Sequence, residues 1–231
     1  MTEAPTYRQT RFVRPPGATE ILLVRHGESR PASTDNPFPL VDGQGDPELA
    51  EVGRDQAIRL GQRLADHPID AVYVTTLRRT VETAQPLCDK KGLQPGIVGD
   101  LREVHLGEWE AGVYRIMAHQ GNPLVATLHE EQEWGVVPGA ETNAQLNQRV
   151  ARGLQGIIAQ HPDQVVMVVV HGGVIGSILH QATGSQPFAF SGADNGSISH
   201  LVAHEGRLSL RKFNDTSHLS HFIGADISLP T

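Results

Sequence analysis

The segment Val165-Val166-Met167-Val168-Val169-Val170 is entirely apolar, and five of its six residues are valine. β-Branched side chains favour strands, and an apolar run without polar alternation is typical of a strand that is buried on both faces. His171-Gly172-Gly173 follows directly, and residues 174–181 have the pattern of a helix. The segment therefore predicts a strand in the middle of a parallel sheet, which leads through a polar turn into a helix.

The rest of the chain continues this alternation of strands and helices. Apolar runs predict strands at residues 20–24, 71–74 and, more weakly, 97–98, and a hairpin at 197–203 and 208–213. Helical spacing is found at residues 48–66, 78–91 and 142–160, and a loop composition at 29–47. Residues 107–138 predict a small helical insertion. The prediction is an α/β fold, a three-layer sandwich with a mostly parallel central sheet and helices on both faces.

Charge and composition limit the partners that the chain can have. The formal net charge is −7 and the isoelectric point is about 5.9, whereas nucleic acids and anionic membranes select basic surfaces. No apolar run is long enough to span a bilayer. We therefore expect neither a nucleic acid nor a membrane as partner. A small anionic ligand in a locally basic pocket is compatible with this composition.

The single cysteine and the N-terminal segment bear on location and domain organisation. Cys88 is the only cysteine, so an intrachain disulfide is impossible, and we expect a buried thiol in a cytoplasmic, reducing compartment. Residues 1–18 lack the apolar core of a secretory signal. We expect them to form a flexible arm, followed by one domain at residues 19–231. A homodimer formed through a sheet edge or a helix face is compatible with the pattern.

Two histidines lie where strands are predicted to end. His26 follows the strand at 20–24 within Arg25-His26-Gly27-Glu28, and His171 follows the valine strand. In open α/β sheets, ligands bind outside the carboxyl ends of the strands, and glycine allows backbone amides to approach them. A neutral imidazole is a nucleophile near neutral pH, and arginines suit the oxygens of a phosphoryl group. These residues together favour phosphoryl transfer.

The sequence resembles the histidine phosphatase (phosphoglycerate mutase-like) superfamily from about residue 19 to residue 219. The resemblance begins at Leu23-Val24-Arg25-His26-Gly27-Glu28-Ser29, the defining N-terminal motif of that family. The later blocks follow in the family's order, at residues 46–53, 77–84, 101–103, 107–110, 138–141, 149–150 and 170–173, with Asn195, Ser197, Asn214 and Asp215 near the end. Several blocks in order are far more specific than one short motif.

The resemblance implies a role for each residue of the pocket. His26 attacks phosphorus and becomes phosphohistidine. Arg25 and Arg79 hold the phosphoryl oxygens, and the neighbouring Arg78 remains a surface residue. His171, expected to be protonated, and the backbone amide of Gly172 donate further hydrogen bonds. The family's chemistry requires neither a metal nor a cofactor.

Glu103 matches the family's general acid and base. In that role it protonates the leaving oxygen and then activates water against phosphohistidine. The alternative for Glu103 is a loop carboxylate paired with Arg102. The other histidines, at positions 200, 204, 218 and 221, have spacings that can ligate metal, but we favour surface histidines.

The choice between hydrolysis and mutase transfer depends on the walls of the pocket. Asp42-Gly43 departs from the patterns of both branches, and Asp42 would repel an anion unless it faces away. Neither residues 31–53 nor residues 116–148 contain lysine or arginine. If these segments wall the pocket, a compact polyanion binds poorly there. We therefore expect a small phosphate monoester whose remaining part is neutral or apolar, hydrolysed without metal.

Alternatives from other classes stay open. They are a cofactor-dependent phosphoglycerate mutase, a catalytically weak module that binds phosphorylated ligands, and a protein phosphatase or interaction protein. An intact nucleophile at His26 argues against the binding module, because a sensor does not need one.

Overall fold

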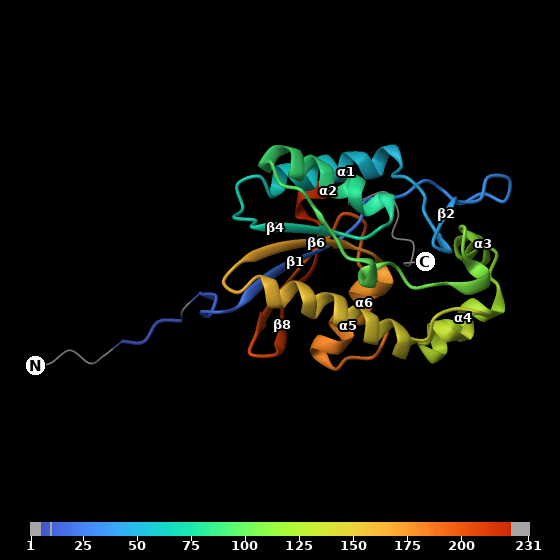
Figure 1. Cartoon of the computed structure of the whole chain (residues 1–231). Coiled ribbons are helices and arrows are strands. Elements are labelled where there is room, and N and C mark those ends of the chain that lie inside the picture. Colours follow the sequence, from blue (N-terminus) through green and yellow to red (C-terminus); the bar gives the residue numbers. More distant parts are fainter. Residues whose placement is uncertain (1–5, 10, 223–231) are drawn as a thin grey trace, which may run out of the picture.

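A computed structural model describes residues 6–9 and 11–222 of the chain. Six strands form one sheet in the order β5-β4-β6-β1-β7-β8 (Figure 1). Only β7 runs against the others: β1 pairs with β6 in parallel and with β7 in antiparallel register. The strand bounds are β1 Thr19–Arg25, β4 Ala71–Val74, β5 Gly96–Ile97, β6 Val165–Val170, β7 Ile198–His204 and β8 Arg207–Asp215. The mostly parallel α/β sandwich predicted from the sequence is confirmed.

The valine strand β6 lies between β4 and β1, and all six of its residues are buried. Val166, Val168 and Val170 face a core that also contains residues of α5 and α6. The alternate residues Val165, Met167 and Val169 face a second core with residues of α1 and α2. Figure 1 shows the two helix pairs on opposite faces of the sheet. Because both faces of β6 are covered, neither set of side chains needs to be polar.

The four covering helices have identifiable ends. Their bounds are α1 Glu51–Arg63, α2 Arg78–Lys91, α5 Asn143–Gln160 and α6 Gly172–Thr183. Thr142 and Gln145 form a capping box that begins α5. Gly92 and Gly184 adopt left-handed backbone angles and end α2 and α6. Cys88 of α2 is buried in the core beneath α1, as predicted.

The helical insertion is confirmed and has a small core of its own. It contains α3 Val113–His119, α4 Pro123–Glu131 and the short helices η2 Gly107–Trp109 and η3 Trp134–Val136. Trp109, Leu128 and Val137 are buried together, and Trp134 packs against them. Two other short helices are η1 Gly99–Leu101 and η4 Ser217–Phe222. No helix of the described residues is both long enough and apolar enough to cross a membrane.

The loop predicted at residues 29–47 contains a miniature hairpin. β2 (Leu40–Val41) pairs with β3 (Gln44–Gly45) around a turn in which Asp42 and Gly43 have φ of 49° and 81°. Positive φ at both central residues is the geometry of a tight hairpin turn. Two-residue strands are too short to show alternation, so the composition alone indicated only a loop. Before β1, Arg14 and Gly17 donate hydrogen bonds to Asp163.

Candidate active site

The carboxyl ends of three neighbouring parallel strands meet at one edge of the sheet. His26 follows β1, His171 follows β6 and Thr75 follows β4. Because Arg25 is in register with Val170, the two histidines are carried side by side. Their ring centroids lie 5.1 Å apart, with the planes inclined at 62°. The expectation that the strand ends bring the two histidines together is therefore met in the geometry.

The hydrogen bonds of His26 fix its tautomer. Its Nδ1 lies 2.7 Å from the carbonyl oxygen of Gly27, which can only accept, so Nδ1 carries the proton. Arg79 Nε donates to the other nitrogen, Nε2, at 3.2 Å, so Nε2 keeps its lone pair. Burial first, and then the charges of Arg79 and Arg25, hold the pKa of His26 well below its ordinary value. His26 is therefore a neutral imidazole with Nε2 available as a nucleophile.

The backbone around His26 is fixed by close contacts. Asn195 donates to the carbonyl oxygen of His26 at 2.9 Å, and the Gly27 amide donates to Thr83 Oγ1 at 2.9 Å. A Cβ atom on Gly27 would lie 2.5 Å from the carbonyl oxygen of Gly53. Only glycine allows the loop after β1 to cross the start of α1 this closely.

Two arginines from different elements flank the histidines. Arg79, in the first turn of α2, is buried and also donates to the Gly45 carbonyl at 2.8 Å. Burial lowers its pKa to about 10, against the opposing effect of Glu103, so it stays a cation at neutral pH. Arg25, at the end of β1, donates from Nη1 to the Ala193 carbonyl. Its buried Nε has no partner among the described residues, so this donor can bind an anion.

His171 is completely buried and is held through Nε2, whereas His26 is held by a backbone carbonyl through Nδ1. His171 Nε2 lies 3.1 Å from Thr75 Oγ1, whereas the buried Nδ1 has no partner among residues 6–9 and 11–222. Burial, followed by the charges of Arg79, His26, Arg149 and Arg25, holds the pKa of His171 well below its ordinary value. This direction is opposite to the protonated state that the resemblance led us to expect.

Glu103 lies beside the first turn of α6. Its Oε2 accepts from the Gly173 amide at 3.3 Å, and its Oε1 accepts from the Val104 amide at 2.9 Å. A Cβ atom on Gly173 would lie 2.7 Å from Glu103 Oε1, so glycine is required for this approach. Arg102 does not pair with Glu103; it pairs with Asp42 at 3.0 Å. Asp42 is thus neutralised by Arg102, and the alternative of a Glu103–Arg102 pair is wrong.

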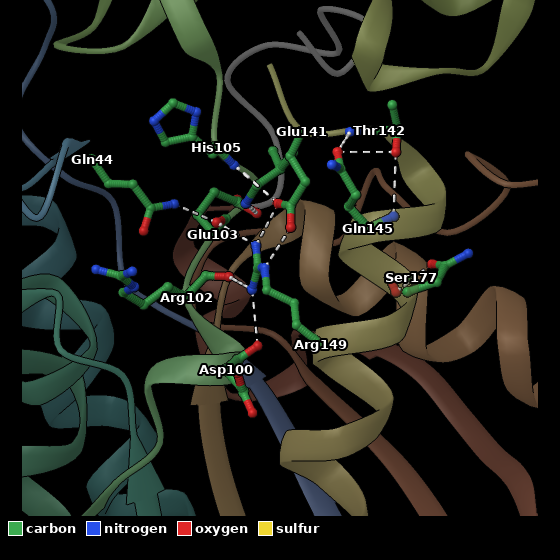
Figure 2. A network of polar contacts seen from close by, with 12 residues as sticks. Gln44, Asp100, Arg102, Glu103, His105, Glu141, Thr142, Gln145, Arg149 and Ser177 are labelled. Carbon is green, nitrogen blue, oxygen red and sulfur yellow. Dashed lines mark hydrogen bonds and ion pairs between the residues drawn. The ribbon is translucent and has the colours of Figure 1, made fainter. Parts of the chain in front are cut away.

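One guanidinium holds the segment that carries Glu103. Arg149 of α5 donates to the carbonyl oxygens of Asp100, Arg102 and Glu103 at 2.9, 2.7 and 2.8 Å. It also binds both carboxylate oxygens of Glu141, at 2.7 and 2.8 Å. Figure 2 shows these five bonds converging on the Arg149 head group. All five N–H donors of the guanidinium are therefore used, and the segment from η1 to Glu103 has one fixed position.

A further arginine lies at the edge of the site. Arg115 of α3 donates from Nη2 to Ser29 Oγ at 2.7 Å and from Nη1 to the Arg30 carbonyl at 3.1 Å. The guanidinium groups of Arg115 and Arg30 both lie over the Phe38 ring. Their Cζ atoms are 5.3 and 4.8 Å from the ring centroid. Arg115 is one of the charges that lower the pKa of His26 and of Arg79. Arg115 therefore adds positive charge near His26.

The remaining predicted residues occupy distinct positions. Gly172 begins α6, and a Cβ atom there would lie 3.6 Å from Arg25 Nε, so its backbone borders that donor. Arg78 lies on the surface and pairs with Glu48 and Glu82. His200 pairs with Glu20 at 3.3 Å. The described residues contain no group of three or more histidine, cysteine, aspartate or glutamate side chains placed to hold a metal. The side chain of His221 lies outside the described residues.

Comparison with known proteins places the chain in a family. A sequence profile of the histidine phosphatase superfamily (branch 1) matches residues 21–216. The chain is 35% identical over 166 residues to phosphoglycerate mutase-like protein 4 of Arabidopsis thaliana, covering 71% of this chain and 70% of that protein. It is 31% identical over 207 residues to the metal-independent phosphoserine phosphatase of the same plant, covering 87% and 84%.

A solved structure agrees with these relatives in fold. The phosphoglycerate mutase from Bacillus anthracis str. Sterne superimposes with a TM-score of 0.75 at 21% identity, covering 89% of this chain and 96% of that one. The chain belongs to the histidine phosphatase superfamily, branch 1. It is a phosphatase of that family, an enzyme that hydrolyses phosphoric monoesters.

Three residues of the site were not found from the sequence. Thr75 follows a predicted strand that is parallel to β6, so the strand-end rule could have indicated it. Arg149 was noted only as part of a family block, because its partners lie 8 to 49 positions away. Arg115 lies one position before residues 116–148, which contain no lysine or arginine. The prediction of a pocket wall without cations was based on those residues and therefore did not include Arg115.

Proposed function

We propose that the chain is a metal-independent phosphatase that hydrolyses a small phosphate monoester through a phosphohistidine intermediate on His26. The observation that carries the proposal is the bonding of His26: Nδ1–H is committed to a carbonyl, and Nε2 keeps its lone pair beside Arg79 Nε. A buried, neutral and oriented imidazole is the form of histidine that can attack phosphorus.

The proposed reaction has two steps. His26 Nε2 forms a bond to phosphorus while the bond to the leaving oxygen breaks, and Glu103 gives that oxygen its proton. Water then attacks the phosphohistidine, the N–P bond breaks, and the Glu103 carboxylate takes the proton of the water. Arg25, Arg79 and the Gly172 amide bind the phosphoryl oxygens, whose charge is spread over three positions in such transfers. The buried, unpartnered Arg25 Nε supports this role.

Metal independence is supported by the charges that the chain itself supplies. Arg25 and Arg79 are cations whose charges act on both histidines, and stabilisation of developing charge by fixed donors is a large term in catalysis. The Arabidopsis relative is named a metal-independent phosphatase, which agrees with this mechanism.

Arg115 changes the substrate class that we propose. The expectation of a neutral or apolar substrate rested on cation-free walls, whereas Arg115 adds a guanidinium next to Ser29, three residues beyond the nucleophile. An arginine whose charge acts on His26 and Arg79 favours a substrate with a second anionic group, such as a carboxylate. The name of the phosphoserine phosphatase relative points to the same class. We therefore propose a phosphorylated amino or hydroxy acid as substrate.

The test is hydrolysis of p-nitrophenyl phosphate from acid to neutral pH, with wild type beside His26→Ala and with EDTA in each arm. We expect turnover in the wild type that EDTA leaves unchanged and a loss of about 10⁴-fold or more in His26→Ala. Quenching in alkaline denaturant, which preserves the acid-labile N–P bond, should trap phosphohistidine in the wild type alone. Equal activity of the two proteins would exclude His26 as the nucleophile, and inhibition by EDTA would exclude metal independence. Transfer to phosphoglycerate with bisphosphoglycerate, without hydrolysis, would establish the mutase instead.

A further inference from the structure

The ring of His171 ends a chain of hydroxyl contacts that lies behind the phosphoryl site. His171 Nε2 is 3.1 Å from Thr75 Oγ1, which is 3.1 Å from Thr80 Oγ1. Thr80 Oγ1 is in turn 2.8 Å from the carbonyl oxygen of Leu77. Thr75 and Thr80 are completely buried, so no solvent hydrogen bond competes with these contacts.

The protons of this chain can be assigned by counting donors. The Leu77 carbonyl only accepts, so the short contact takes the single proton of the Thr80 hydroxyl. Thr80 then has no proton left for Thr75, and the Thr75 hydroxyl donates to Thr80. Thr75 Oγ1 also accepts from the Leu77 amide at 3.2 Å, which leaves one lone pair for His171. The proton of the last contact therefore belongs to His171 Nε2.

The opposite direction leaves a contact without a proton. If Thr75 donated to His171, Thr80 would have to donate to Thr75, and the Leu77 carbonyl would face a bare hydroxyl oxygen at 2.8 Å. Alternatively, Thr80 would keep its bond to Leu77, and the two hydroxyl oxygens would lack a proton between them. With the Thr80 proton on its shortest contact, to Leu77, only one direction gives a hydrogen to both the Thr75–Thr80 and the Thr75–His171 contacts.

The assignment determines the state of the other ring nitrogen. In a neutral ring with the proton on Nε2, Nδ1 is bare and can only accept. The charged groups around the ring are Arg25 from β1, Arg79 from α2 and Arg149 from α5, with His26 alongside. The nearby acidic group is Glu103, which bonds the Gly173 amide. Burial and these cations hold the pKa of His171 low, so the ring stays neutral until an anion offsets them.

We propose that Thr75 holds His171 as the Nε2–H tautomer and that Nδ1 gains one proton when a phosphoryl group binds beside Arg25 and Arg79. The proton comes from solvent when the ligand is a dianion, and from the ligand itself when it is a monoanion. The imidazolium Nδ1–H then donates to a phosphoryl oxygen, which a bare Nδ1 cannot do. The proton uptake rests on the proposed function of the site, whereas the tautomer does not.

Calorimetry measures the proton uptake. Inorganic phosphate, a dianion at pH 8, is titrated into the protein in buffers of different ionisation enthalpy. We expect about one proton taken up per phosphate bound in the wild type. Glu103→Gln should retain this uptake and His171→Gln should lose it. Binding without uptake, or an uptake that disappears in Glu103→Gln, would overturn the assignment to His171.

Nitrogen-15 NMR of the histidine rings tests the tautomer without ligand or turnover, so it still decides if phosphate does not bind. We expect a protonated Nε2 on His171 and a protonated Nδ1 on His26, which serves as the internal reference. Thr75→Val should change the His171 pattern and lower kcat about tenfold, and Thr75→Ser should restore both. A wild-type His171 protonated on Nδ1, or an unchanged pattern in Thr75→Val, would refute the role of Thr75. Absence of phosphate binding with the expected tautomer would count against the proposed function alone.

Discussion

The strands β1 and β6 lie side by side and each ends in a buried histidine, yet the two rings are tied through opposite nitrogens. His26 is held by the backbone carbonyl of Gly27 on Nδ1, whereas His171 is held by the Thr75 side chain on Nε2. The proposed nucleophile is thus oriented by a backbone carbonyl, and His171 by a hydroxyl that a substitution can remove. Nε2 of His26 therefore keeps its lone pair, whereas Nδ1 of His171 can gain or lose a proton.

Apart from the histidines themselves, the largest effect on activity is expected at the two adjacent arginines that begin α2, Arg78 and Arg79. Arg79 touches His26 Nε2, whereas its neighbour Arg78 forms ion pairs on the surface. We expect Arg79→Met to lower kcat/KM by about 10²- to 10³-fold, because it removes a fixed donor from the charge that develops on the phosphoryl group. Arg78→Met should stay within about twofold. Steady-state kinetics on both variants checks this, and equal losses would show that α2 acts through its overall charge.

A smaller effect is expected at Arg149, which positions Glu103 and touches neither histidine directly. Lysine has three donors and cannot reproduce the five bonds of the guanidinium. We expect Arg149→Lys to lower kcat by about 10- to 100-fold, as Glu103→Gln should, because displaced catalytic groups lose about this much. Unfolding in urea should show a loss of about 1–3 kcal/mol from unpaired carbonyl groups.

The matched control for Arg149 lies one turn along the same helix. Arg152 pairs with the Asp100 carboxylate on the surface, whereas Arg149 binds the backbone carbonyls of Asp100, Arg102 and Glu103. Arg152→Lys should therefore leave kcat at the wild-type value. If Arg149→Lys changed stability but not kcat, the five-bond arrangement would be structural only.

The strand-end half of the site could be predicted from the sequence because its determinants are local. The valine run defines β6 and the motif around His26 defines the end of β1, so parallel pairing alone brings the histidines together. Helix α2 was predicted with its exact bounds at 78–91, because Gly92 ends it in a left-handed conformation. A resemblance between motifs then distinguished Arg79 from Arg78.

The remaining contacts of the site could not be predicted because their determinants are distant in the sequence or depend on tertiary packing. Arg149 meets carbonyl groups 46 to 49 positions earlier, and no local pattern encodes that contact. The direction of Arg115 depends on how α3 packs through Trp109 and Tyr114, whose ring centroids lie 6.1 Å apart. Asp42 was expected to repel an anion unless it faces away, and in the tight turn between β2 and β3 it pairs with Arg102.

Arg115 tests the substrate class with two matched esters. Phosphoserine carries a carboxylate that phosphoethanolamine lacks, and the two are otherwise alike. We expect Arg115→Gln to lower the preference for phosphoserine, as the ratio of the two kcat/KM values, by about tenfold, since a charge-assisted hydrogen bond is lost. Arg207→Gln, at the exposed start of β8 on the far end of the sheet, is the control. An unchanged ratio would remove the carboxylate from the proposed substrate.

The smallest effect concerns stability at acid pH, where both histidines act with the same sign. The pKa values of His26 and His171 are held below the ordinary value of 6.5 by burial and by the neighbouring arginines. Below about pH 6.5 the two histidines are therefore protonated in the unfolded chain but not in the folded site, and the free energy of unfolding decreases as the pH falls. Each histidine contributes at most about 1.4 kcal/mol per pH unit. Urea unfolding at pH 7.5, 6.5 and 5.5 should show a shallower decline in His171→Gln and in His26→Asn than in the wild type. Parallel declines in all three proteins would show that the two rings take up protons in the folded state, and Nδ1 of His171 could then not be reserved for a proton that arrives with the phosphoryl group.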